Sequence, residues 1–232
     1  MGSLPLGPGA QYTRTVIVSA SRRTDLPALY LDWFMGRLAA GGCLVRSPYD
    51  ASSLRRVALD PSEVECVVFW TRDPRGLASR AREIERMGFR FYVHVTLCAY
   101  PAPIEPSGLW IEAGTDALRE LADAVGPERA LWRYDPVFVA EGLDAGFHRS
   151  AFERMAARLE GATRRVSLSL LDEYAGTAAR LKRAGFPGVV FGSPRAASLS
   201  AGGPRVALSS AGGPVGAAPL SAGGPVGAAP LS

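Results

Sequence analysis

Short runs of β-branched and aromatic residues alternate with helical stretches along most of the chain, and this alternation constrains the fold more than any other feature. We predict strands at Thr15–Ala20, Cys66–Thr71, Phe89–Leu97, Ala130–Tyr134, Arg165–Leu170 and Gly188–Phe191. These runs show little alternation of apolar and polar residues, which is typical of parallel strands buried on both faces. Two shorter strands are predicted in "CLVRSP" and "LRRVAL", ahead of the Cys66 strand.

Helices are predicted between the strands, because apolar residues recur there with a 3.6-residue period. The residues that share a helix face are Leu77, Ala81 and Ile84, then Leu118, Leu121, Ala122 and Val125, then Phe152, Met155, Ala156 and Leu159. Gly88, Gly126 and Gly185 each follow such a run, at the position where a left-handed residue ends a helix. Asp25 precedes "LPALYLDWFMGRLAAGG" and is predicted to cap that helix, with Pro27 in its first turn.

Repeated βα units imply right-handed crossovers and either a barrel or a doubly wound sheet. The first strand is followed by no glycine-rich dinucleotide fingerprint, and the sequence contains no Walker loop. Both absences favour the barrel. Five or six strands are too few for the eight of a complete barrel. The predicted fold is therefore a partial TIM-like (β/α) barrel of five or six parallel strands, incomplete at its C-terminus.

Composition argues against several functional classes. The net charge is +4, but the basic residues are spread along the chain without interleaved aromatics, so nucleic-acid binding is not expected. No apolar run reaches the roughly 18 residues of a membrane span, and the N-terminus lacks the features of a signal peptide. Cys43, Cys66 and Cys98 are far apart in sequence, which predicts reduced thiols without a local metal site in a cytoplasmic protein.

Polar, charged or aromatic residues follow five successive predicted strands. In parallel β/α folds, functional groups collect at the carboxyl ends of strands. We therefore predict a ligand-binding site formed by Ser19, Arg22, Arg23, Asp25, Trp70, Arg72, Arg133 and Asp135. Arginine side chains of this kind suit a phosphate or a carboxylate. The catalytic residues cannot be named, and no metal ligand is expected.

Each of these motifs also has a purely structural interpretation. In "SRRTD", Asp25 could serve solely as a helix cap, while the arginines pair with nearby acids or lie in solvent. In "WRYDP", strand alternation places Arg133 and Asp135 on one face and Trp132 and Tyr134 on the other, so the charged pair could be a structural bridge. "FWTRDP" could simply end a strand in a turn.

Neither of the two histidines is predicted to be catalytic. His94 lies between valines in a predicted strand, which favours a core histidine with satisfied hydrogen bonds. His148 lies beside Arg149 on a predicted helix, which favours the surface.

The motifs "VSASRRTDLPALYLDWFMGRLAAGGCLVRSPYD", "CVVFWTRDP", "YVHVTL" and "GPERALWRYDPV" occur in this order between about Val16 and Gly192. Together they resemble the bacterial and archaeal proteins of the domain of unknown function 1848 family. Members commonly have Lys-Asn-Pro where this chain has Arg72, Asp73 and Pro74, and often Thr-Pro-Tyr near Cys98.

The resemblance implies a radical-type enzyme with an iron–sulfur cluster and S-adenosylmethionine as cofactors. Its members end in a CxxxCxxC cluster motif, whereas this chain has no cysteine after Cys98. We therefore expect a chain truncated before the cluster, without cofactor and inactive as it stands. The alternative is a metal-free β/α module that binds an anionic small ligand through its strand-end arginines. Neither the oligomeric state nor the substrate follows from the sequence.

The last part of the chain differs in composition from the rest. The unit SAGGPVGAAPL occupies 210–220 and repeats unchanged at 221–231. Such a repeat is too poor in large apolar residues to form a packed layer. We predict a disordered lead at 1–12, a partial β/α barrel domain at 13–195 and a disordered low-complexity tail at 196–232.

Overall fold

The computed structural model describes residues 16–21, 23–47, 49–50, 52–105, 110–172, 176–189 and 207–208. Within these ranges the helices are α1 (Leu26–Leu29), α2 (Leu31–Ala39), α3 (Arg75–Arg86), α4 (Ile111–Val125), α5 (Ala145–Arg158) and α6 (Thr177–Arg183). The strands are β1 (Val16–Ser19), β2 (Gly42–Arg46), β3 (Leu54–Ala58), β4 (Val64–Thr71), β5 (Phe91–Thr96), β6 (Ala130–Val137), β7 (Val166–Leu170) and β8 (Ala207–Leu208).

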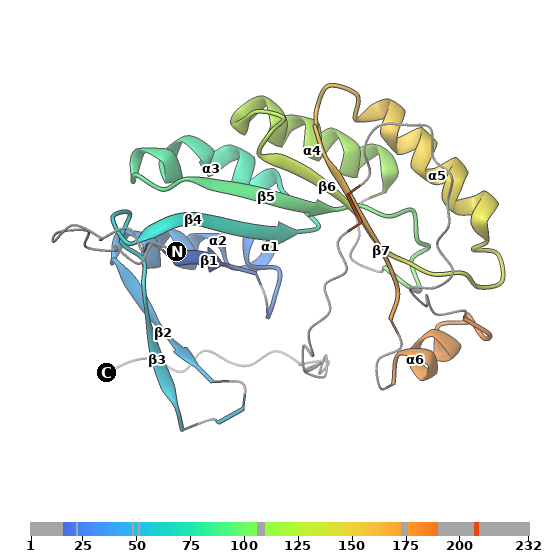
Figure 1. Ribbon diagram of the computed structural model, residues 1–232, viewed down its shortest axis with the longest axis horizontal. Helices are drawn as coiled ribbons and strands as arrows, with labels where there is room; N and C mark the ends of the chain where they lie inside the picture. The colour runs from blue at the N-terminus through green and yellow to red at the C-terminus, as the bar shows by residue number, and fades with distance from the viewer. Residues whose placement is uncertain are drawn as a thin grey trace, which may run out of the picture.

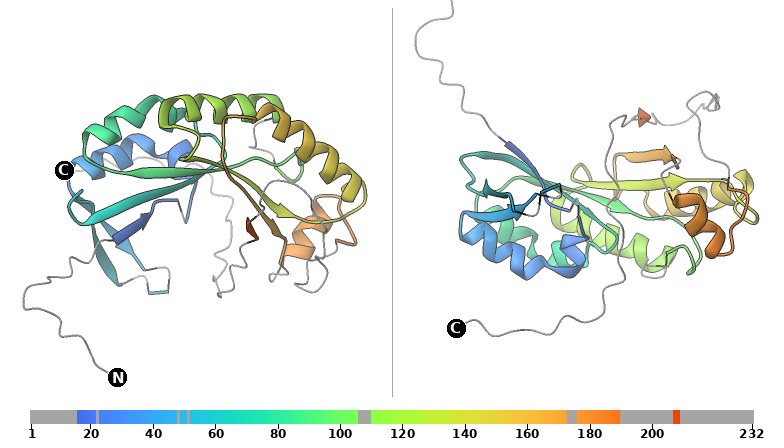
Figure 2. Two further views of the ribbon diagram at one scale, coloured as in Figure 1. Left: turned by 45° about the horizontal axis from the view of Figure 1, so that its top comes forward. Right: turned by 90° about the horizontal axis from the view of Figure 1, so that it is seen from below.

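The main sheet has the strand order β1-β4-β5-β6-β7-β8, and all its neighbouring strands are parallel. The sheet curls into half a barrel, with α3, α4 and α5 along its outer face (Figures 1 and 2). This architecture confirms the predicted partial β/α barrel. The carboxyl ends of β4, β5 and β6 lie side by side, so side chains at these ends share one edge of the sheet.

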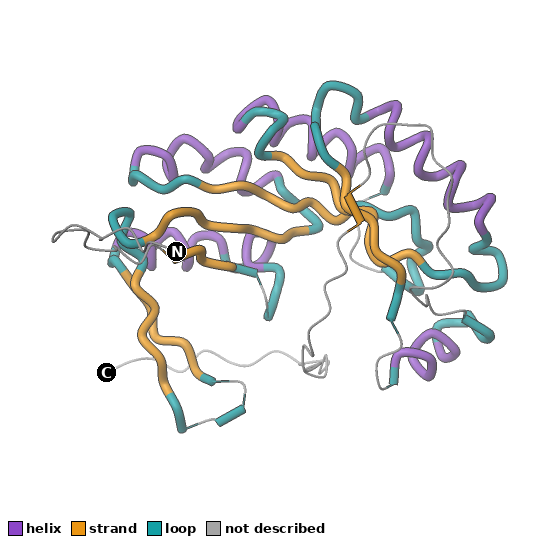
Figure 3. The backbone as a smooth tube through the Cα atoms, viewed as in Figure 1, coloured by secondary structure: helices purple, strands orange, loops and turns teal. Residues whose placement is uncertain are grey.

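The strands predicted in "CLVRSP" and "LRRVAL" are β2 and β3. They pair with each other in antiparallel fashion and form a separate two-stranded sheet. Figure 3 shows this hairpin projecting away from the main sheet.

The predicted strand at Gly188–Phe191 is wrong where the structure describes it. Gly188 has a φ of 72°, a left-handed conformation that interrupts an extended strand, and Pro187 before it has no N–H to donate. Residues 190 and 191 lie outside the described residues. The outer neighbour of β7 is β8, which lies in the predicted low-complexity tail. The rest of that tail and the predicted disordered lead lie outside the described residues.

The outer face of the sheet packs against the helices and forms the core. Phe69, Val93 and Val95 are fully buried there against apolar residues of α3 and α4. Every α3 and α4 residue that was predicted to share a helix face is buried. The other face of the strands is only half buried on β5, where buried and partly exposed residues alternate. The prediction of strands buried on both faces is therefore wrong for β5, because the helices cover only one side.

Helix ends follow the predicted chemistry. The Asp25 side chain accepts a hydrogen bond of 3.2 Å from the Ala28 N–H and caps α1. Gly88 follows α3 with a φ of 88°, which an L side chain rarely adopts. These two features fix the turns that lead from β1 into α1 and from α3 into β5.

Candidate functional site

The inner, concave face of the sheet carries most of the predicted site. Strand alternation and partial burial place the following side chains on this face: Ser19, Trp70, Tyr92, His94, Thr96, Arg133 and Asp135. Trp70 is opposite His94 in the β4–β5 register, and Thr96 is opposite Arg133 in the β5–β6 register. The parallel register thus brings residues from distant parts of the sequence into neighbouring rows. We call this set the concave face.

His94 lies at the centre of the concave face. Its ring stacks on Trp70, with the ring centroids 5.4 Å apart and the planes 7° apart, and Tyr92 meets its edge. The His94 Nδ1 atom is buried and has no hydrogen-bond partner among the described residues. Burial, together with the positive charges of Arg133 and Arg165, lowers the pKa of His94 to about 4. His94 is therefore a neutral ring at pH 7 whose buried Nδ1 has no hydrogen-bond partner among the described residues, and it is not the satisfied core histidine predicted from sequence.

Two serine hydroxyls near the end of β1 share this lack of partners. Ser19 ends β1 and Ser21 follows it, and the buried Oγ atoms of both have no hydrogen-bond partner among the described residues. Ser19 lies opposite Val68 of β4, next to the row that holds Trp70 and His94. Buried polar atoms are almost always paired in native proteins. Three unpaired atoms around one end of a sheet therefore require an explanation.

Arg133 and Asp135 form an ion pair on the concave face. The side chains are 28% and 15% exposed, so the pair is accessible but largely withdrawn from water. Burial raises the pKa of Asp135, while Arg133 and Arg72 act to lower it. The predicted alternation is confirmed, since Trp132 and Tyr134 point to the helix-covered side and are buried. A partly desolvated pair of this kind can exchange one partner for a ligand, or it can be structural.

Arg72, which directly follows β4, is held by two acidic side chains. Its side chain pairs with Glu105 in the β5–α4 loop, and its backbone N–H donates a 2.7 Å hydrogen bond to Asp25 Oδ2. Asp25 thus serves the helix cap and the β4 end at once. Glu105 was not predicted as a site residue, because it lies in a proline-rich loop 33 residues from its partner.

The remaining predicted residues are not brought into this arrangement. Arg23 is exposed in the loop before α1, and no ion-pair partner is found for it within the described parts of the chain. Arg22 lies outside the described residues. The structure therefore places Ser19, Asp25, Trp70, Arg72, Arg133 and Asp135 around the strand ends, and leaves the two adjacent arginines of "SRRTD" without a described role.

The prediction that His148 lies on the surface is wrong. His148 is 7% exposed and fully engaged under β6. Its Nε2 lies 2.8 Å from the Phe138 carbonyl oxygen, which can only accept, so Nε2 donates. Its Nδ1 then accepts the 2.9 Å hydrogen bond from the Tyr134 hydroxyl. The sequence pattern of α5 and β6 did not show whether His148 is buried or exposed, because the aromatic residues around His148 follow no helical period.

The described residues do not fit an iron–sulfur cluster. Cys43 lies on β2, Cys66 on β4 and Cys98 after β5, and no group of three His, Cys, Asp or Glu suited to a metal ion is found in the described ranges. Burial raises the pKa of all three thiols, that of Cys98 to about 12. Cluster ligands are closely grouped thiolates, so the separation of these cysteines on three different parts of the fold opposes a cluster.

Comparison with known proteins gives one result. Residues 17–199 match the domain of unknown function 1848. Neither the curated proteins nor the solved structures contain a match to the chain. Within the described ranges, none of the helices is both long and apolar enough to span a membrane.

Proposed function

The chain belongs to the domain of unknown function 1848 family, and we propose that its half-barrel binds a small ligand bearing a phosphate or carboxylate on the concave face. One observation carries the proposal: buried polar atoms without partners gather beside a half-buried ion pair at the carboxyl ends of the strands. Leaving such an atom unpaired costs about 1–3 kcal/mol. Ligand hydrogen bonds to His94 Nδ1 and to Ser19 Oγ would remove that penalty.

The charges around His94 favour an anionic ligand. Arg133 and Arg165 both lower the pKa of His94, which means that their positive potential reaches its ring. The neutral ring adds a hydrogen bond without repelling a cationic part of the ligand. The Trp70 ring beside it offers an apolar flank. We assign Arg133 the role of anion-binding residue and His94 that of hydrogen-bonding partner.

The resemblance to radical-type enzymes is compatible with this proposal if ligand binding and cluster binding are carried out by different parts of the protein. We propose that the described half-barrel contributes the ligand-binding face and does not itself hold the iron–sulfur cluster or carry out cluster chemistry. The separation of Cys43, Cys66 and Cys98 on different parts of the fold supports this assignment. Anaerobic reconstitution with iron and sulfide, followed by visible absorbance and iron analysis, is expected to give no bound cluster. A stoichiometric cluster that is lost when Cys66 and Cys98 are replaced by serine would overturn it.

Ligand binding is tested by a thermal-shift screen with nucleotides, phosphorylated metabolites and di- and tricarboxylates. Loss of the charge in Arg133→Gln is expected to weaken any hit at least tenfold, because a charge-assisted hydrogen bond contributes about 1.5–3 kcal/mol. Arg164→Gln is the matched control, because Arg164 pairs with Glu128 on the surface away from the concave face. Equal loss in both variants, or no loss in either, would exclude Arg133 as the anion-binding residue.

A further inference from the structure

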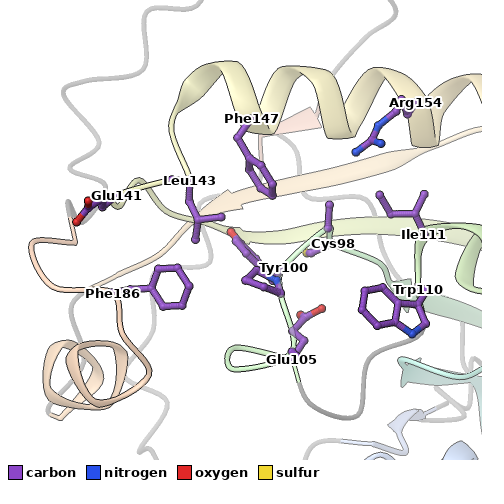
Figure 4. A pocket seen from close by; sticks show the side chains of 14 residues that line it. Cys98, Tyr100, Glu105, Trp110, Ile111, Glu141, Leu143, Phe147, Arg154 and Phe186 are labelled. Atoms are coloured by element: carbon purple, nitrogen blue, oxygen red, sulfur yellow. The ribbon is translucent and has the colours of Figure 1, made fainter.

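A cavity lies beyond the strand ends, and none of its lining residues belongs to the concave face. Its volume is about 490 Å³, within the range of small-molecule sites. The β5–α4 loop, the β6–α5 loop, α5 and the segment after α6 surround it, as Figure 4 shows. We call it the α5 pocket.

Most of the lining of the α5 pocket is apolar. Aromatic rings enter it from three separate elements: Tyr100 from the loop after β5, Phe147 from α5 and Phe186 from the segment after α6 (Figure 4). The Tyr100 hydroxyl already donates a 2.7 Å hydrogen bond to the Pro136 carbonyl oxygen. Tyr100 therefore presents its ring, and not a free polar group, to the pocket. These walls suit a flat hydrocarbon or aromatic group.

The charges at the pocket are not balanced. Arg154 projects from α5 toward the pocket, and no ion pair or hydrogen bond is found for it among the described residues (Figure 4). The carboxylate of Glu105 is already paired with Arg72. Glu141 also lines the pocket, but its carboxylate points away in Figure 4. The pocket thus has, at its solvent-exposed edge, one arginine that has no ion-pair partner among the described residues.

Trp110 adds an aromatic group at the rim. Its side chain is among the lining residues and is 76% exposed. When a ligand ring covers an exposed tryptophan beside an apolar cavity, apolar surface is removed from water and the free energy of binding becomes more favourable. Trp110 also provides a spectroscopic reporter at the entrance.

We infer that the α5 pocket is a binding site for a small aromatic carboxylate. The ring lies among Tyr100, Phe147 and Phe186, and the carboxylate pairs with Arg154. This site is independent of the proposed anion site on the concave face, because it uses none of that site's arginines. The α5 pocket would thus take a second class of ligand. Burial of the ligand's ring would supply most of the affinity, and the ion pair with Arg154 would fix its orientation.

The test uses phenylacetate and its neutral counterpart phenylacetamide as probes of the full chain. Binding is followed by ligand-observed NMR and by tryptophan fluorescence. Wild-type protein is expected to bind the acid about tenfold more tightly than the amide, the ratio that one charge-assisted hydrogen bond gives. Arg154→Gln is expected to abolish this preference, whereas Arg149→Gln, an exposed arginine on the same helix, preserves it.

Two further variants separate the ring site from the charge. Phe186→Ala is expected to weaken both probes equally, and Trp110→Phe to remove the fluorescence change while binding persists in NMR. Failure of phenylacetate to bind wild-type protein at millimolar concentration would overturn the proposal. An acid preference that survives in Arg154→Gln, or is lost equally in Arg149→Gln, would also overturn it. Variant folding is checked by circular dichroism, and none of these outcomes depends on Arg133.

Discussion

The two faces of the same parallel sheet differ in how deeply their side chains are buried and in whether their buried polar atoms have hydrogen-bond partners. On the helix-covered face, Phe69 and Val93 are fully buried, and the side chains around them are apolar. On the concave face, Trp70 and His94 occupy the next positions along the same strands, are half buried and leave a polar atom unpaired. Because the backbone is shared, the difference must come from what covers each face. The helix-covered face forms the core of the fold, and the concave face is the one on which we propose that a ligand binds.

The two histidines show the same contrast at the level of single atoms. His148, under the helix-covered side of β6, uses both ring nitrogens in hydrogen bonds to Tyr134 and Phe138. His94, on the concave face, stacks on Trp70 but leaves Nδ1 without a partner. A protein interior compensates a buried polar group when stability is its only role. The unpartnered nitrogen of His94 is therefore a main reason why we propose that the concave face binds the ligand.

The largest expected effect compares two adjacent residues of β4. Phe69→Ala is expected to lower the free energy of unfolding by about 3–5 kcal/mol, because it leaves a cavity among packed rings of the core. Trp70→Ala, one position along and on the opposite face, is expected to cost only about 1–2 kcal/mol. Urea denaturation measures both. Equal losses would mean that the concave face is a second structural core.

A smaller effect concerns the pH dependence of stability. The pKa of His94 is about 4 in the folded chain, below its ordinary value of 6.5, so the unfolded chain binds the proton more readily. Its contribution to stability is present above pH 6.5 and is lost as the pH falls from 6.5 through 4. The effect is modest, because solvent screens a half-buried ring.

The variant His94→Gln isolates this contribution from that of the carboxyl groups, including Asp135. Its unfolding free energy is expected to decline less steeply than that of wild type between pH 6.5 and pH 4. Parallel curves for the two proteins would show that His94 titrates normally and is not withdrawn from water.

Much of the fold could be predicted from sequence, because its signals are local. The apolar period of α3 and α4, the Asp25 cap and the glycine after α3 each depend on a few neighbouring residues. The common facing of Arg133 and Asp135 also follows from strand alternation alone. These features need no knowledge of which segments meet in space.

The features that the sequence did not predict depend on contacts between distant segments. The partner of Arg72 is Glu105, and the two residues meet only because the fold places the end of β4 beside the loop that follows β5. The burial of His148 depends on Tyr134 and Phe138 lying over α5. The sequence did not show that the concave face is only half buried, because aromatic and aliphatic residues occur on both faces of the strands. His94 was misread for the same reason.

The most direct test of the central claim is to observe both histidine rings while a ligand from the screen is added. Long-range ¹H–¹⁵N NMR at pH 7 resolves the four ring nitrogens, and His148 is an internal control on the opposite side of the sheet. The account predicts that His94 Nδ1 shifts in a saturable way, that His148 stays unchanged, and that Arg133→Gln weakens the response. Saturable ligand binding that leaves the His94 signals unmoved would contradict it.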